Sequence, residues 1–163
     1  MRWIRMTLLV LLAAGLTLPH AAADRIDPAW EKLKSLVGAW EGTYAGKPYQ
    51  VSYALISNGT ALMETMEGTD ASQMVTVYHP DGSSYLMTHY CSMGNQSRMR
   101  SKGLQNGRIE FSFVDVTNVR SPEEHRMTRL VMSFPDPSHL VHEWTSKSGA
   151  KEESSRFEFA RRK

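Results

Sequence analysis

Cysteine is almost missing from this sequence of 163 residues, in which Cys91 is the only one. A single thiol excludes an intramolecular disulfide framework and a zinc site built from several cysteines. Internal repeats and low-complexity segments are missing as well, and no apolar run reaches the about 20 residues that a membrane-spanning helix needs. A chain without these devices must be held together by its own core.

The sequence also has little excess of charge of either sign. The formal net charge is +2, and it comes from Arg2 and Arg5, the only charged residues before Asp24. Without those two, 17 Lys and Arg residues stand against 17 Asp and Glu residues. This balance argues against a nucleic acid or an anionic membrane surface as the main partner.

The first 23 residues have the three parts of a secretory signal peptide. Two arginines come first, the segment from Met6 to Leu18 is uncharged, and small alanines precede Asp24. The apolar part is short, which favours a cleaved signal over the alternative of a retained anchor. We therefore expect residues 1–23 to be removed and residues 24–163 to form one exported domain, periplasmic or secreted, with no stable membrane insertion afterwards.

Secondary-structure signals predict one helix followed by strands. Asp27 is suited to cap a helix that begins with Pro28 and ends before Gly38. From Trp40 onward apolar residues alternate with polar ones in short segments separated by turn residues. The pattern predicts an all-β fold, an up-and-down antiparallel β-barrel of about ten strands. Residues 115–126 are expected to form an irregular loop or a lid. The ten expected strands begin at Trp40 and then cover 49–55, 61–67, 74–79, 85–91, 98–104, 108–114, 127–134, 139–145 and 152–161.

Two features of this pattern resemble the calycin barrels, the group that includes lipocalins and nitrobindin-like proteins. The segment Gly38-Ala39-Trp40 stands where a short helix enters the first strand, and Arg156 stands in the last strand. The resemblance implies that Trp40 packs under Arg156 and closes the base of the barrel. It also implies an internal cavity for a small, largely apolar molecule. The alternative is that Trp40 is a core aromatic residue and Arg156 a surface charge.

Several polar residues fall on expected strands, where a purely structural barrel would favour apolar pairs: Glu64, His89, Arg98 and Arg100. Either they face the cavity, where Arg98 or Arg100 recognises an acidic head group, or they face outward or pair with one another. Met87 and Trp144 are the expected apolar contacts of the ligand. Eight methionines follow residue 23 and suit either an adaptable pocket or a gap-filling core.

Three kinds of chemistry compete with simple binding. His89 and Cys91 share one face of a strand and suggest a Cys–His nucleophile, but same-face neighbours are about 7 Å apart, too far for direct proton transfer. The sequence contains no His-x-x-x-His pair on an expected helix and no cluster of cysteines, so no metal is expected. The nitrobindin resemblance suggests haem, held by a histidine near the C-terminus. The last expected strand contains no histidine, and His142 on the preceding strand is the nearest candidate for the axial ligand.

The sequence therefore predicts an exported protein that holds a small apolar molecule, with or without an acidic head group, in a β-barrel cavity. No cofactor is expected. Two alternatives remain: a haem-binding or enzymatic barrel that uses His89, Cys91 or His142, and a structural barrel with no ligand.

Overall fold

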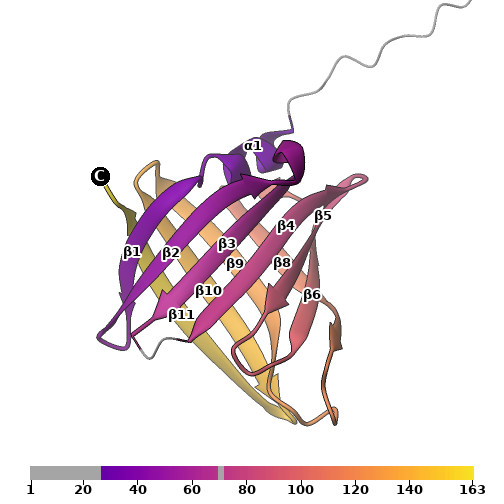
Figure 1. The fold of residues 1–163 in the computed structure, drawn as a ribbon. Helices are drawn as coiled ribbons and strands as arrows, with labels where there is room; N and C mark the ends of the chain where they lie inside the picture. Colours follow the sequence, from indigo (N-terminus) through magenta and orange to yellow (C-terminus); the bar gives the residue numbers. More distant parts are fainter. Residues whose placement is uncertain (1–26, 70–71) are drawn as a thin grey trace, which may run out of the picture.

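The computed structural model of the chain describes residues 27–69 and 72–163 (Figure 1). The expected signal peptide lies outside these residues. In the described ranges, no helix combines the length and the apolarity that a membrane crossing requires. The elements are α1 (Pro28–Lys34), β1 (Gly38–Tyr44), β2 (Lys47–Ile56), a 3-10 turn η1 (Ser57–Gly59), β3 (Ala61–Gly68), β4 (Gln73–Asp81), β5 (Ser84–Tyr90), β6 (Gln96–Ser101), β7 (Leu104–Gln105), β8 (Arg108–Thr117), β9 (Arg126–Asp136), β10 (His139–Ser148) and β11 (Lys151–Arg161).

The strands form one closed antiparallel barrel. Each strand from β1 to β6 pairs with the next, β8 to β11 do the same, and β1 pairs with β11. Pairing of β6 with β8 closes the cylinder, and the two-residue β7 also pairs with β8. Ten strands therefore make the barrel wall in sequential order, which confirms the expected fold class.

Two expected boundaries were wrong. The strand expected over 98–104 is divided, because β6 ends at Ser101 and Leu104 belongs to β7. Residues 115–126 were expected to be irregular, but β8 continues to Thr117 and β9 begins at Arg126. The end of β8 is a strand because β6, far away in the sequence, pairs with it: Ser97 pairs with Val116 and Gln96 with Thr117. Cross-strand hydrogen bonds thus extend the ladder to Thr117. The connecting segment is 118–125.

Alternation along each strand separates an inner from an outer face. On β10, Leu140, His142 and Trp144 point inward and are buried, and the same pattern holds on the facing strands. The inner side chains form one continuous core. Four of the methionines belong to it: Met66, Met87, Met99 and Met132.

Helix α1 closes one end of the barrel, the upper end in Figure 1. The carboxylate of Asp27 accepts hydrogen bonds from the backbone N–H groups of Ala29 and Trp30, at 3.1 and 3.4 Å. This is the expected N-cap, which satisfies donors that have no partner within the helix. Leu33 and Leu36 are buried against the core, whereas Val37 is 42% exposed because the helix has already ended at Lys34.

Trp40 lies at this closed end, but its cationic partner is Arg161 and not Arg156. The Arg161 guanidinium lies 4.2 Å from the centroid of the Trp40 ring. The indole N–H donates to the Leu36 carbonyl at 2.8 Å, and Arg161 donates to the carbonyls of Val37 and Ser35 at 2.9 and 2.6 Å. The stack therefore joins α1, β1 and the end of β11.

The register of β1 and β11 explains the correction. Trp40 stands directly opposite Arg161, so both side chains lie on the same face of the sheet. Arg156 is five residues earlier, and an odd separation turns its side chain to the outer face. There it donates to Glu143 and Glu158 at 3.0 and 2.9 Å.

Candidate functional site

The middle of the barrel contains a group of buried polar side chains among apolar ones. Tyr53 comes from β2, Glu64 from β3, Tyr78 from β4, His89 from β5 and His142 from β10. They face inward because each stands an even number of residues from a core side chain on its own strand. Two of the expected ligand residues, Glu64 and His89, are therefore interior.

Glu64 and Tyr78 form the shortest hydrogen bond of this group. The Tyr78 hydroxyl donates to the Glu64 carboxylate at 2.7 Å, and Tyr53 stands opposite Glu64 in the β2–β3 register. Burial raises the pKa of Glu64 to about 7, although the hydroxyl groups of Tyr78 and Tyr53 act in the opposite direction. A carboxyl group in this setting exchanges its proton near neutral pH.

The two interior histidines are neutral at pH 7. Burial lowers the pKa of His89 to about 4, and burial together with the nearby His89 lowers the pKa of His142 to about 3. Each ring has one nitrogen paired: Nδ1 of His89 lies 2.9 Å from the Thr76 hydroxyl, and Nε2 of His142 lies 3.0 Å from the Tyr53 hydroxyl. The other ring nitrogen of each histidine has no hydrogen-bond partner in the described part of the chain.

Four buried polar atoms in the described part of the chain have no hydrogen-bond partner: His89 Nε2, His142 Nδ1, Ser97 Oγ and Asn95 Oδ1. Three of them are connected by position. Ser97 stands opposite His89 in the β5–β6 register, and Asn95 precedes Ser97 by two residues. His89 also interacts electrostatically with His142. We call these four residues the polar track; it extends from the β5–β6 connection into the middle of the barrel.

Trp144 and Met87 are the apolar neighbours of the polar track. The rings of Trp144 and His89 are 4.7 Å apart between centroids, and those of Trp144 and His142 are 6.4 Å apart. Met87 is fully buried on the same face of β5 as His89 and stands opposite Met99. Both residues named from the sequence as apolar contacts are thus interior.

Arg98 and Arg100 are on the outer face, and the expectation that they reach into the cavity was wrong. They alternate with Ser97 and Met99, which are fully buried. Arg98 pairs with Asp115, and its Nε lies 2.6 Å from that carboxylate. Arg100 pairs with Asp81 at 2.6 Å. Their exposure and these partners agree with the alternative that they face outward.

The Cys91–His89 pair has no support in the geometry. Nδ1 of His89 is hydrogen-bonded to Thr76, and no hydrogen bond joins His89 to Cys91 among the residues described. Burial raises the pKa of the Cys91 thiol, which disfavours the thiolate that a nucleophile needs.

Haem does not fit the interior histidines. Nε2 of His142 already faces the Tyr53 hydroxyl, and the His142 ring lies 5.5 Å from that of Phe159. Trp144 occupies the space beside His89 at 4.7 Å, so a porphyrin would have to displace buried aromatic side chains. Within residues 27–69 and 72–163, no group of three or more His, Cys, Asp or Glu side chains is placed to hold a metal ion.

Of the interior polar side chains, sequence reasoning named Glu64, His89 and His142. It missed Ser97 and Asn95, which look like ordinary turn residues, and it missed Tyr53 and Tyr78, which look like ordinary strand aromatics. One signal was available: Ser97 and Met99 alternate with two arginines, so the serine and not the arginines shares the face of an apolar residue.

Comparison with known proteins adds no family. Neither a model of a protein family nor a curated protein matches the chain. The closed, sequential, antiparallel ten-strand barrel is consistent with calycin-like folds.

Proposed function

We propose that this protein is an exported binding protein that holds a small, largely apolar molecule inside the barrel and recognises a neutral polar group through the polar track. The observation that carries the proposal is the set of four buried polar atoms without a partner. Each such atom costs about 1–3 kcal/mol when it is left unpaired. A ligand that pairs with several of them recovers this free energy on binding.

The charges of the interior favour a neutral ligand group over an acidic one. Both histidines of the track are neutral at pH 7, and Glu64 is an acid that gains a negative charge as pH rises. Arg98 and Arg100, the cations named from the sequence, are outside and paired. A hydroxyl, carbonyl or amide group on the ligand matches imidazole, hydroxyl and amide partners at no cost in buried charge.

In this proposal the ligand reaches the polar track from the end opposite α1. Asn95 stands at this end, just before β6 begins. Segment 118–125 is bonded to the neighbouring connections there: Asn95 donates to the His125 carbonyl at 2.6 Å, and Gly149 N–H donates to the Glu123 carbonyl at 3.1 Å. In this proposal the segment covers the entrance and must separate from Asn95 to admit a ligand.

The finer family assignment and the export belong to the same proposal. The sequential order, the single capping helix and the Trp40–Arg161 stack support a lipocalin-like barrel. The basic, apolar and small-residue parts of residues 1–23 support export.

Native mass spectrometry of the protein purified from its own compartment tests the proposal. We expect a bound small molecule whose retention falls in the double variant His89→Gln, Ser97→Ala. Arg98→Gln, which changes the outer face of the same strand, is the matched control and should retain it. A ligand-free mass together with no thermal shift across a panel of lipids and metabolites would establish the filled structural barrel instead.

A further inference from the structure

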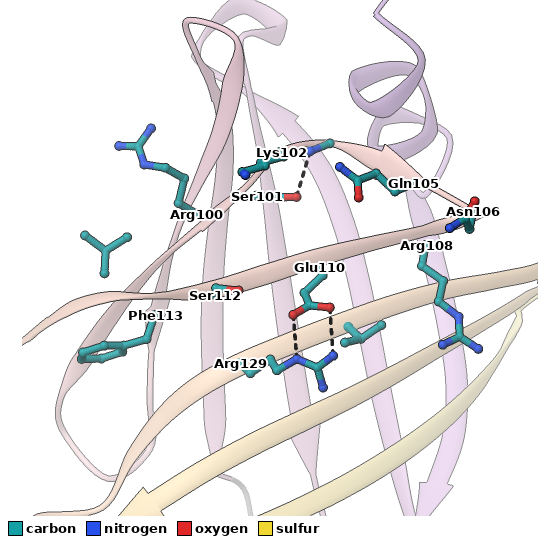
Figure 2. Close-up of a pocket in the computed structure, with 13 residues that line it drawn as sticks. Arg100, Ser101, Lys102, Gln105, Asn106, Arg108, Glu110, Ser112, Phe113 and Arg129 are labelled. Carbon is teal, nitrogen blue, oxygen red and sulfur yellow. Dashed lines mark hydrogen bonds and ion pairs between the residues drawn. The ribbon is translucent and has the colours of Figure 1, made fainter.

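A groove of about 850 Å³ lies on the outer surface of the barrel, beside β8 where β6 gives way to β7 (Figure 2). Its lining includes Arg100, Glu110 and Arg129, which are exposed on the outer face. The inner side chains Ile109 and Phe111 of β8 are fully buried. The groove is therefore separated from the barrel interior by the strand wall.

A bulge in the sheet creates this groove. Arg100 pairs with Ser112, and Leu104 pairs with Ile109, so residues 101–103 stand opposite only Glu110 and Phe111. Gly103 makes the bulge possible, because its φ is +98° and a Cβ there would lie 3.1 Å from Tyr85. The extra residue places Lys102 on the groove lining.

The groove carries uncompensated positive charge. Four cations line it, Arg100, Lys102, Arg108 and Arg129, and Glu110 is the one anion among the lining residues. Glu110 forms a bidentate pair with Arg129 at 2.8 Å for each bond, and Arg100 pairs with Asp81 outside the lining. Lys102 and Arg108 form no ion pair with any residue that the structure describes.

An exposed apolar surface stands at the other end of the groove. Phe113 and Val114 belong to the lining and are 40% and 45% exposed. In Figure 2 Phe113 lies on the far side of Glu110 from Arg108. Along β8, Arg108 and Phe113 are five residues apart, or about 17 Å. Lys102 stands between these two ends, because residues 101–103 lie opposite Glu110 and Phe111. The groove is therefore long enough to hold a bicyclic aromatic acid between a cation and Phe113.

We propose that this groove is a second binding site, specific for a small organic anion with a flat apolar body. Its acidic group is attracted by the charges of Lys102 and Arg108, which form no ion pair within the described chain. Its apolar body lies on Phe113 and Val114. The volume is within the range of about 300–1,000 Å³ typical of small-molecule sites. The site is independent of ligand binding inside the barrel.

Calorimetric titration with naphthoate tests the site, with naphthamide as the uncharged analogue of the same shape. We expect saturable binding of naphthoate that weakens with added salt, and binding of naphthamide at least about tenfold weaker. The double variant Lys102→Gln, Arg108→Gln should lose about tenfold in affinity for naphthoate. The double variant Lys47→Gln, Lys163→Gln removes the same charge away from the groove and should bind within about twofold of the unchanged protein.

Three results would overturn the proposal. One is the absence of saturable binding up to millimolar naphthoate, and another is an equal loss in the two charge variants. The third is a loss of naphthoate binding in His89→Gln, Ser97→Ala, because that result places the anion inside the barrel. Thermal unfolding of all three double variants checks that every compared protein is folded.

Discussion

At the scale of single residues, burial decides the protonation of Glu64. Its pKa is raised from 4.5 to about 7 because the carboxylate is removed from water and receives only partial compensation from tyrosine hydroxyls. Folding therefore favours the protonated form. The contribution of Glu64 to the free energy of unfolding is therefore fully present below pH 4.5 and is lost as pH rises through about 7.

We expect the substitution Glu64→Gln to remove this pH dependence. Glutamine has the shape of the protonated acid and still accepts the Tyr78 hydrogen bond. Relative to the variant, the free energy of unfolding of the unchanged protein should fall by about 3 kcal/mol between pH 4.5 and pH 7. Urea unfolding at a series of pH values measures the difference.

Other titrating groups are present in both proteins, so the comparison cancels them. His89 and His142 act with the opposite sign: their folded pKa values are lowered, so their contribution to stability is present above pH 6.5 and is lost at acid pH. A difference between the two proteins that stays constant with pH would show that burial does not shift the pKa of Glu64.

Arg161 and Arg156 provide a second test at the residue scale. Arg161 stacks on Trp40 and donates to two carbonyls at the end of α1, whereas Arg156 forms exposed ion pairs. Arg161→Gln should destabilise the protein by about 2 kcal/mol, and Arg156→Gln by less than about 1 kcal/mol. Chemical denaturation measures both, and equal losses would contradict the stack as the closure of the barrel.

At the scale of elements, α1 is held by its buried face and not by its own helical propensity. It has only seven residues, and isolated helices this short are unstable in water. Its contact with the barrel therefore decides whether it forms. Leu33 is fully buried in that contact, while Val37 just beyond the helix is exposed.

The substitution Leu33→Ala should destabilise the protein by about 2–5 kcal/mol, because it removes a buried side chain and leaves a cavity. Val37→Ala is the matched control and should change stability by less than about 0.5 kcal/mol. Thermal and urea unfolding distinguish them. A small effect of Leu33→Ala would mean that α1 does not seal the barrel end.

Strand positions were largely predictable because alternation is a local property of the chain. The ten strands followed from it, and the Asp27 cap followed from another local signal, an aspartate directly before Pro28. The end of β8 did not, because its last residues are held by β6 through pairing that no local pattern contains. The bulge at Gly103 escaped prediction for the same reason.

At the scale of the whole molecule, a single continuous core joins the closed end to the polar track. Leu33 and Trp40 at the capped end belong to the same core cluster as Met87 and Trp144 beside the track. Pairing of β1 with β11 and of β6 with β8 closes this core inside one barrel. Unfolding of the capped end would therefore expose the core side chains around the polar track to water.

We expect the protein to unfold in one cooperative transition. Tryptophan fluorescence follows the environments of Trp30, Trp40 and Trp144, and far-ultraviolet circular dichroism follows the strands. The two transitions should coincide in urea. An earlier fluorescence transition would show that the capped end melts separately from the barrel.

The amino-acid sequence by itself determined the all-β barrel, its capping helix and the sets of residues that share a face, because the two-residue period of a strand is written into each segment. It did not determine which face is inside. That depends on closure of the sheet, which placed Ser97 and His89 in the core and Arg98 and Arg100 in solvent. Tertiary structure alone also chose Arg161 over Arg156 as the partner of Trp40 and brought His89, His142 and Trp144 together. These contacts join residues far apart in the chain, and only the register of non-local strands brings them into reach.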